Sequence, residues 1–458
     1  MEHVEIAVIG AGPGGYHCAQ LLGAAGKKVI LFEAEHVGGT CLNEGCMPTK
    51  ALLNCAKRYR HAKDSKVFGV TAENVSYNHK KAVAKKNGIV RRLVAGVENT
   101  LKESGVMIIR ESAFLNGRTD NGFAVKTPGG AEYEAEKVVL AAGSETVIPP
   151  IPGLKEGLAS GFVVTNREFL SLTELPEHFA VIGGGVIGLE MACFLASVGV
   201  KVTVVEMMPK IAGTTDAEAC ALLQSSYEKR GMRFLLGTQV KRVEEDGLYT
   251  EKDGRGEKIF CDRVLLSAGR RAHTAGLGLE SLGIAAERGA VVTDAKLCTN
   301  VPGIYAVGDV NGRLMLAHTA YREAEAVANQ LLGKEDEMDY SLIPSVIYTD
   351  PEVACVGESK ESAEKKGMAC REIVLPMAYS GRFMAESESG QGFIKLVTEE
   401  GTGCVLGVTL VGLYASEMIL SAEMMIGSRL PAEALRKLIF PHPTVGEVMK
   451  EALFRIEE

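Results

Sequence analysis

The sequence lacks the features that mark membrane, nucleic-acid-binding and secreted proteins. No apolar run reaches the roughly 18 residues that a membrane-spanning helix needs. Its 50 basic residues are outnumbered by 58 acidic ones, and the net charge of −8 offers no positive surface for nucleic acid. The N-terminus, MEHVEIAVIG, has no basic segment before a long apolar one, so we expect no signal peptide. These absences predict a cytoplasmic protein that binds neither membrane nor nucleic acid.

Cysteine is too scattered for a secreted disulfide scaffold, although the chain has 11 of them. One pair stands out, because only four residues separate Cys41 from Cys46. This spacing is not the C-x-x-C of thioredoxins, and a single pair lacks the four ligands of a structural zinc site. We therefore expect no metal centre. The pair is either two unrelated thiols or a redox-active dithiol, and its place just after a nucleotide-binding motif favours the second interpretation.

A repeated βαβ pattern indicates two nucleotide-binding folds. With 458 residues the chain is too long for one hydrophobic core, so about three domains are expected. Residues 5–33 and 179–206 each contain an apolar strand, a G-x-G-x-x-G turn, an apolar helix and a second strand that ends in glutamate. A lone glycine motif would be weak, but this context disfavours two loops that bind nothing.

Each glycine of the motif has its own physical task. The first makes the tight turn after the strand, the second lets a pyrophosphate approach the backbone, and the third lets helix and strand pack closely. The phosphates meet the helix N-terminus, where free N–H groups and the helix dipole favour an anion. The glutamate accepts hydrogen bonds from the adenosine ribose. The two predicted sites are built on Gly10, Gly12, Gly15 and Glu33, and on Gly183, Gly185, Gly188 and Glu206.

The C-terminal third has a different pattern, without a phosphate-binding loop. Three strands are expected in residues 345–350, 393–399 and 404–412, followed by helices in residues 415–427 and 431–439. This order predicts an α+β domain. The methionine-rich stretch from Met418 to Met425 is expected in a core or a subunit interface, not at a ligand.

The run GGTCLNEGCMPTK, residues 38–50, resembles the active-site signature of the class I pyridine nucleotide–disulfide oxidoreductases. The resemblance extends over the whole chain and implies FAD at the first glycine motif and a nicotinamide dinucleotide at the second. The segment TNVPGIYAVGD, residues 299–309, is similar to the family's second FAD motif, whose aspartate, here Asp309, binds the flavin's ribitol chain. By the same resemblance, further nucleotide contacts are expected at Thr40, Lys50, Gly143, Val240, Gly269, Met315, Ala317 and His318.

The fold class that follows is α/β, with two Rossmann-like dinucleotide-binding domains (FAD and NAD) and a C-terminal α+β dimerisation domain. The expected parts are an FAD-binding domain (1–146), an NAD-binding domain (147–270), a central segment that completes the FAD domain (271–338) and the dimerisation domain (339–458).

The segment PHPTVGE, residues 441–447, is similar to the family's motif for the catalytic base. A carboxylate that orients one ring nitrogen of a histidine leaves the other free to move protons, which suits His442 with Glu447. In the family this base comes from the second subunit of a homodimer. The resemblance also implies that Cys46 faces the flavin and that Cys41 exchanges with the substrate.

Charged residues are expected near both nucleotides. The resemblance pairs Lys50 with Glu190 near the flavin, and a surface salt bridge is the alternative. Glu206 can bond a ribose 2′-hydroxyl and would repel a 2′-phosphate, which favours NAD over NADP. Lys210 is the only nearby cation, and we expect it to be solvated.

Within the family, the sequence most resembles the enzymes that oxidise protein-bound dihydrolipoamide to lipoamide with NAD+. These are the E3 components of 2-oxo acid dehydrogenase complexes and of the glycine cleavage system, so a separate lipoyl-bearing chain (E2 or H-protein) would be the partner. Phe440 stands where those enzymes often carry a first histidine, which leaves reduction of another small disulfide by NADH as an alternative. A flavin-binding subunit without activity would have lost its redox and acid–base residues, and Cys41, Cys46, His442 and Glu447 are all present.

Overall fold

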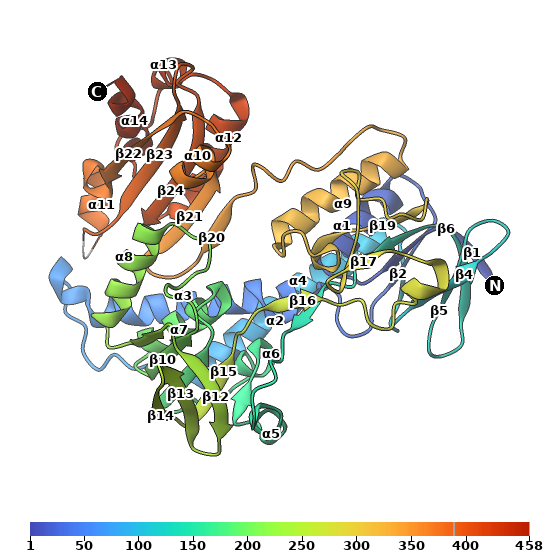
Figure 1. Ribbon diagram of the computed structural model, residues 1–458, viewed down its shortest axis with the longest axis horizontal. Helices are drawn as coiled ribbons and strands as arrows, with labels where there is room; N and C mark the ends of the chain where they lie inside the picture. Colours follow the sequence, from blue (N-terminus) through green and yellow to red (C-terminus); the bar gives the residue numbers. More distant parts are fainter. Residues whose placement is uncertain (388–389, 458) are drawn as a thin grey trace.

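The first domain is built on a seven-stranded, mostly parallel sheet (Figure 1). The structure is a computed structural model that describes residues 1–387 and 390–457. The path of the sheet is β3 (Met107–Ile109), β2 (Val29–Phe32), β1 (Glu2–Ile9), β6 (Glu132–Leu140), β5 (Phe123–Lys126) and β4 (Phe114–Arg118). The strand β2 and residues 6–9 of β1 are continuously apolar and buried, as expected where both faces of the sheet are covered.

Residues 271–338 return to this first sheet. β19 (Ile304–Ala306) pairs in parallel with β6, so that Tyr305 lies opposite Val139. The hairpin of β17 (Ala286–Glu287) and β18 (Ala290–Val291) precedes it. After a 3-10 turn the chain enters α9 (Ala317–Leu331), which lies beside α1 (Pro13–Ala24) on one face of the sheet. The end of the predicted second FAD motif is thereby brought to the first glycine loop.

The second domain repeats the same construction. Its five-stranded parallel sheet has the order β11 (Arg233–Leu236), β10 (Lys201–Glu206), β9 (His178–Ile182), β15 (Arg263–Leu266) and β8 (Val163–Val164). Its helices are α5 (Leu154–Ser160), α6 (Asn166–Phe169), α7 (Val186–Ser197) and α8 (Ala217–Glu228). A small antiparallel sheet of β12 (Gln239–Glu244), β13 (Gly247–Lys252) and β14 (Arg255–Phe260) is added. The chain enters and leaves this domain through one antiparallel pair, β7 (Ser144–Thr146) with β16 (Arg270–Ala272).

A helical segment joins the two nucleotide-binding folds. It consists of α2 (Gly39–Glu44), α3 (Cys46–Lys63), a 3-10 turn (Ser65–Phe68) and the long helix α4 (His79–Glu103). The helix α3 packs against α4 and also against α7 of the second domain. The helix that begins at Cys46 therefore bridges the two folds.

The C-terminal domain has two more strands than the sequence predicted. Its antiparallel sheet has the order β20 (Ser345–Ile347), β21 (Glu352–Gly357), β24 (Val405–Gly412), β23 (Phe393–Glu399) and β22 (Cys370–Pro376). The strands β21 and β22 were missed; β22 is an edge strand whose exposed polar residues break the apolar pattern.

The helices of this domain also differ from the prediction. They are α10 (Lys360–Lys365), α11 (Gly381–Glu386), α12 (Ala415–Ser428), α13 (Ala432–Arg436) and α14 (Glu447–Phe454). The helix expected over 431–439 is shorter, because α13 ends at Arg436. Met418 and Met425 lie in the domain core, as predicted, whereas Met424 is exposed on the outer side of α12. The domain boundaries given above stay a prediction. No helix in the described part of the chain is long and apolar enough to cross a membrane.

Candidate active site

The first glycine motif is shaped to receive a pyrophosphate. Gly10 has φ +102°, and a Cβ there would lie 2.3 Å from the carbonyl oxygen of Ala141 at the end of β6. A Cβ on Gly15 would lie only 1.8 Å from the oxygen of Gly10, so helix and strand require a glycine at this contact. A Cβ on Gly12, in contrast, would meet no protein atom within 4 Å. The open space lies at the glycine whose backbone a phosphate should approach, at the start of α1.

The second motif has the same geometry. Gly183 has φ +103°, and its Cβ would lie 2.2 Å from the oxygen of Ser267 at the end of β15. A Cβ on Gly188 would lie 2.4 Å from the oxygen of Gly183, and one on Gly185 would meet nothing within 4 Å. Both loops therefore fit a dinucleotide. The matching contacts indicate that the same backbone design is used twice.

The two glutamates at the strand ends are held against their loops. Glu33 accepts hydrogen bonds from the backbone N–H groups of Ala11 (2.8 Å) and Glu35 (2.8 Å). Glu206 accepts from the N–H groups of Gly184 and Met208, both at 2.7 Å. A carboxylate has about four lone-pair sites, so each side chain keeps acceptor capacity for ribose hydroxyls. The predicted ribose contacts remain predictions that these positions support.

The prediction for Lys210 was wrong, since this side chain is not solvated. Its ammonium group donates to the carbonyl oxygens of Gly213 and Thr215, the latter at 2.6 Å. The lysine therefore closes the loop that follows Glu206 instead of pointing into solvent. A charge occupied in this way is poorly placed to attract a 2′-phosphate, which strengthens the preference for NAD.

The turn that carries Asp309 is fixed by residues that the sequence did not single out. Ser144 donates to the Asp309 carboxylate at 2.5 Å, and the guanidinium of Arg270 donates to the Ser144 hydroxyl at 2.8 Å. Burial lowers the pKa of Arg270, while the nearby charge of Asp309 opposes that effect. Ser144 and Arg270 each follow a glycine that was predicted to contact a nucleotide, and this adjacency was the available signal.

A buried carboxylate supports the same turn from below. Glu323 on α9 accepts from the Gly308 N–H (2.5 Å), the Asn311 amide (3.0 Å) and the Tyr340 hydroxyl (2.5 Å). Burial raises the pKa of Glu323, and the three donors oppose that rise. The predicted contacts Met315, Ala317 and His318 follow this turn, at and just before the start of α9.

The redox pair lies where α2 gives way to α3. Gly45, with φ −141° and ψ −108°, ends the first helix, and Cys46 begins the second. The two sulfurs are hydrogen-bonded: the bond from Cys41 lowers the pKa of Cys46 to about 7, against burial, and raises that of Cys41. Lys50 also lowers the pKa of Cys46. The Lys50 charge thus favours the ionised form of Cys46, and the roles of the two sulfurs stay a prediction.

Lys50 and Glu190 form the predicted ion pair, and it is not a surface one. Their charged atoms are 2.8 Å apart, and the Glu190 side chain is almost fully buried on α7. The second oxygen of Glu190 accepts from the N–H of Tyr348 at 3.0 Å, and the lysine ammonium lies 4.3 Å from the Tyr348 ring centroid. The pair therefore joins α3, the second domain and the start of the C-terminal domain around Cys46.

Two tyrosines of the first domain lie near enough to the redox pair for its charge to act on them, and neither was predicted. The hydroxyls of Tyr16 on α1 and Tyr321 on α9 are hydrogen-bonded, and their rings meet edge to face. Burial raises the pKa of both phenols, and charge on Cys41 or Cys46 adds to the rise. Tyr16 directly follows the third glycine of the first motif, which was the only signal for it.

His442 and Glu447 form the predicted pair at the start of α14. The ring atom Nδ1 lies 2.8 Å from a Glu447 oxygen, and the other oxygen accepts from the Thr444 N–H at 2.8 Å. These two bonds hold the pKa of Glu447 below its ordinary value. Because an ionised carboxylate only accepts, Nδ1 must carry the hydrogen, which leaves Nε2 free to take a proton.

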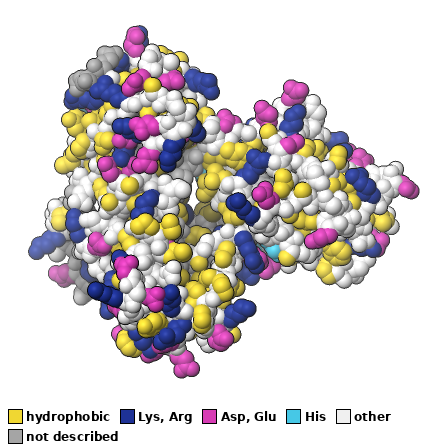
Figure 2. Space-filling view, in the orientation of Figure 1, with side chains coloured by type: hydrophobic (Ala, Val, Ile, Leu, Met, Phe, Trp, Pro, Cys, Tyr) yellow, Lys and Arg dark blue, Asp and Glu magenta, His cyan; other side chains and the backbone are white. Residues whose placement is uncertain are grey.

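Within one chain this histidine is remote from the cysteines. The turn between α13 and α14, which carries His442, lies at the outer end of the C-terminal domain, whereas α2 lies in the middle of the molecule (Figure 1). The His442 side chain is 80% exposed. Apolar side chains are also exposed on this domain (Figure 2), among them Leu420, Met424, Leu430, Leu438 and Ile439. A second subunit would cover such a surface.

Comparison with known proteins identifies the family. The model for "Pyridine nucleotide-disulphide oxidoreductase" matches residues 4–324, and that for its dimerisation domain matches residues 343–453. The chain belongs to the pyridine nucleotide-disulphide oxidoreductases. It is therefore an oxidoreductase that uses FAD and NAD and dimerises through its C-terminal domain.

Full-length relatives and structures agree with this family. The chain is 34% identical to dihydrolipoyl dehydrogenase of Chlamydia muridarum, over 98% of this chain and 96% of the relative. It is 37% identical to that of Thermus scotoductus, over 99% and 97%. Among solved structures, the HOCl-induced flavoprotein disulfide reductase RclA from Escherichia coli superposes with a TM-score of 0.87 at 28% identity, over 99% and 100% of the two chains.

The other predictions concern metal ions and further nucleotide contacts. No cluster of metal-ligating side chains occurs in residues 1–387 and 390–457. Val240 lies half-buried on β12. Thr40 directly precedes Cys41, and Gly143 and Gly269 lie just after the ends of β6 and β15. Their contacts with nucleotides stay predictions.

Proposed function

We propose that the protein oxidises dihydrolipoamide carried by a separate lipoyl-bearing protein and that NAD+ is the final electron acceptor. The observation that carries the proposal is the hydrogen-bonded pair of Cys41 and Cys46 beside the Lys50–Glu190 ion pair. The relatives named dihydrolipoyl dehydrogenase match almost the whole chain, and Glu206 suits NAD.

Thiol–disulfide exchange at the pair accounts for the oxidation. One substrate thiolate attacks the sulfur of Cys41 in the Cys41–Cys46 disulfide, and Cys46 leaves as a thiolate. The second substrate thiolate then attacks the substrate sulfur that is bound to Cys41. This step closes the lipoyl disulfide and releases Cys41. Two electrons and two protons pass from the substrate, and the electrons remain on the cysteine pair.

The protons need an acceptor, because a dihydrolipoyl thiol is mostly protonated at neutral pH. His442 of the partner subunit serves this purpose, with Glu447 orienting its ring so that Nε2 faces the substrate. The Lys50 ammonium stabilises the Cys46 thiolate that leaves. Tyr16 and Tyr321 border the same place from the first domain.

The nucleotides are held by the loops described above. When bound, FAD supplies the two-electron chemistry that links a dithiol to NAD+. The residues that would hold FAD are the first glycine loop, Glu33 and Asp309; those that would hold NAD are the second glycine loop and Glu206. The chain's own contribution is to place Cys46 and Lys50 between these two sites.

A second candidate function is reduction of another small disulfide by NADH. The likeness to RclA, which is named a disulfide reductase, and Phe440 at the place of the first histidine both favour it. The Phe440 ring packs against the core of the C-terminal domain and so supplies no proton acceptor. The same residues would act in the reverse direction.

One experiment separates the two candidates. The purified holoenzyme is mixed without oxygen with dihydrolipoamide and NAD+, and NADH formation is followed by its absorbance. Rapid turnover with NAD+, at least about tenfold faster than with NADP+, supports the proposal. Cys46→Ser should abolish it, whereas Cys55→Ser, a half-buried thiol on the same helix, should not.

Failure of this reaction would have a clear meaning. If NADH reduces the bound flavin but dihydrolipoamide does not, the lipoamide assignment is wrong. Turnover of NADH with an alternative disulfide would then establish the second candidate. We place the enzyme in the cytoplasm, because the scattered cysteines of the sequence suit a compartment in which thiols stay reduced.

A further inference from the structure

The peptide between the two redox cysteines is held by the NAD-binding domain. Glu44 is the last residue of α2, and its carbonyl oxygen accepts a hydrogen bond of 2.7 Å from the side-chain amide of Asn166. Its carboxylate lies 2.8 Å from Nε of Arg167. Both partners belong to α6, far away in the sequence and in the other nucleotide-binding domain. Two adjacent side chains therefore hold the main chain and the side chain of one residue.

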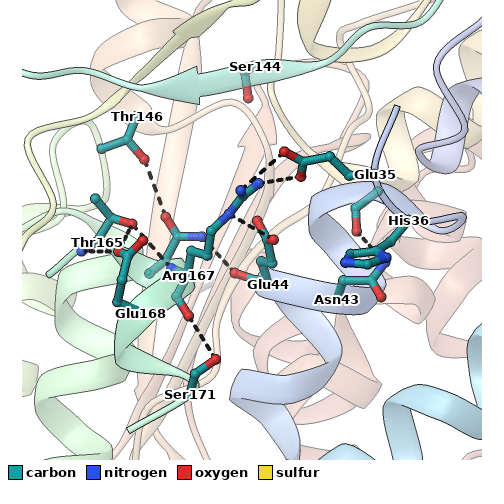
Figure 3. Close-up of polar contacts among 12 residues, drawn as sticks. Glu35, His36, Asn43, Glu44, Ser144, Thr146, Thr165, Arg167, Glu168 and Ser171 are labelled. Carbon is teal, nitrogen blue, oxygen red and sulfur yellow. Dashed lines mark hydrogen bonds and ion pairs between the residues drawn. The ribbon is translucent and has the colours of Figure 1, made fainter. Parts of the chain in front are cut away.

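The same arginine also reaches the FAD-binding domain. Its two terminal nitrogens contact the two oxygens of Glu35, at 3.2 and 2.5 Å. Glu35 lies two residues after the predicted ribose ligand Glu33, and its N–H donates to the Glu33 carboxylate. Figure 3 shows the Arg167 guanidinium between Glu35 and Glu44. The arginine thus joins three segments: the end of the first βαβ unit, the redox loop and α6.

The anchor on α6 is itself rigid. Thr165 and Glu168 form a capping box at the start of the helix, in which Glu168 accepts from the Thr165 N–H (2.9 Å) and hydroxyl (2.6 Å). The Asn166 side chain is buried, with 8% exposed, and its carbonyl oxygen lies 3.4 Å from the Thr146 hydroxyl. Its own burial and the contact with Thr146 thereby restrict the position of the Asn166 amide.

The contacts of Asn166 and Arg167 with Glu44 matter because Gly45 is the next residue in the chain. A Cβ on Gly45 would lie 2.9 Å from the Thr40 oxygen, so the chain turns closely around the residue before Cys41. The orientation of the Glu44–Gly45 peptide decides where α3, and with it Cys46, begins relative to Cys41. Asn166 and Arg167 therefore hold the segment that sets the distance between the two sulfurs.

We infer that Asn166 and Arg167 are positioning residues for the redox loop, which keep Cys41 and Cys46 in the geometry from which their disulfide closes. The inference rests on the proposed redox role of this pair but not on the identity of the substrate. Reduction of the disulfide consumes two electrons and two protons and gives two thiols, and dithiothreitol supplies both when it closes to its cyclic disulfide. A loop that holds the thiols together raises their effective concentration and so favours the disulfide.

Loss of the contacts between α6 and Glu44 should therefore make the disulfide easier to reduce. For Asn166→Ala combined with Arg167→Ala we expect the equilibrium constant for closure to fall about tenfold, which for two electrons is about 30 mV towards a more positive potential. Each single variant should give part of this change. Arg167→Lys should resemble Arg167→Ala, because an ammonium group cannot contact both glutamates with a fork.

The test poises the holoenzyme in mixtures of reduced and oxidised dithiothreitol. Acid quenching, alkylation and peptide mass spectrometry then give the fraction of the Cys41–Cys46 pair that is oxidised. The matched control is Arg233→Ala, since Arg233 makes a similar two-point contact with Glu257 (2.8 and 2.9 Å) on the surface of the same domain. It should leave the equilibrium unchanged.

The outcomes are distinct. A shift in the Asn166 and Arg167 variants, with flavin content retained, supports the inference even if dihydrolipoamide proves not to be the substrate. A lower melting temperature with an unchanged closure constant would overturn it and leave α6 a purely structural contact. If the pair never forms a disulfide in any dithiothreitol mixture, the redox role itself fails, and with it the proposed function.

Discussion

Cys46 shows how the function depends on the immediate surroundings of one atom. Burial alone would raise the pKa of this thiol and keep it protonated at neutral pH. The hydrogen bond from Cys41 and the charge of Lys50 reverse that effect and bring its pKa to about 7. Glu190 acts in the opposite direction, although it is also the residue that fixes the Lys50 ammonium.

Substitution of Lys50 tests this balance. Lys50→Met removes the cation, so the pKa of Cys46 should rise above about 7 and the thiolate should form only at higher pH. The rate of alkylation of the reduced enzyme at neutral pH should fall about three- to tenfold. The measurement is the pH profile of iodoacetamide labelling at Cys46. Lys57→Met, on the same helix, is the control, and coinciding profiles for Lys50→Met and wild type would refute the role given to Lys50.

At the scale of secondary structure elements, the two glycine loops separate what folding needs from what binding needs. The third glycine of each motif is required by the protein, since a Cβ there would strike the oxygen of the first glycine. The second glycine faces open space in both loops. The glycine spacing that occurs twice in this sequence therefore serves helix–strand packing at the third glycine and leaves room for a ligand at the second.

The NAD loop allows a sharp comparison of the two positions. Gly185→Ala should fold and retain FAD, at a cost of about 1 kcal/mol or less for the changed helix N-cap, yet bind NADH about tenfold more weakly or worse. Gly188→Ala should be destabilised by about 1–3 kcal/mol, because helix and strand must move apart. Thermal melting and NADH binding by fluorescence distinguish the two. Equal binding losses with equal melting temperatures would contradict the assignment.

At the scale of the whole molecule, His442 and the cysteine pair of one chain lie far apart. His442 is oriented by Glu447, but it lies on the outer end of the C-terminal domain, next to Ile439, which is 96% exposed. The redox pair lies between the two nucleotide-binding domains. In the proposed mechanism, dimerisation through the C-terminal domain brings His442 of the partner subunit to the dithiol.

Mixed dimers test this arrangement directly. Homodimers of Cys41→Ser and of His442→Gln should each lose nearly all activity. A co-expressed heterodimer carries one site with an intact cysteine pair and the intact His442 of the partner subunit, so it should regain about half of the wild-type activity. Activity is measured after the mixed dimer is purified with two different affinity tags. A heterodimer without activity would mean that cysteines and histidine act within one chain.

The sequence predicted the local features of this protein well. The two glycine motifs, the glutamates that end their strands and the His442–Glu447 pair are where the sequence placed them. The Lys50–Glu190 pair joins residues far apart in the chain, and only the family resemblance predicted it. Strongly periodic βαβ units can be recognised without tertiary information because each contains its own turn, cap and packing signals. The edge strand β22 escaped, since a half-exposed strand has a weaker apolar pattern.

What the sequence determined by itself is which chemical groups are present and which lie near one another along the chain. The tertiary structure decided the rest. In the folded chain Lys210 bonds to its own loop, and Glu323 accepts from the Gly308 N–H beside Asp309. Asn166 and Arg167 hold Glu44 from another domain. The bonds of Lys210 stay within its own loop, whereas those of Glu323, Asn166 and Arg167 join residues that are separated by many positions. The contacts to Glu44 also depend on how whole domains pack. No local pattern encodes such a distance, so only the folded chain shows it.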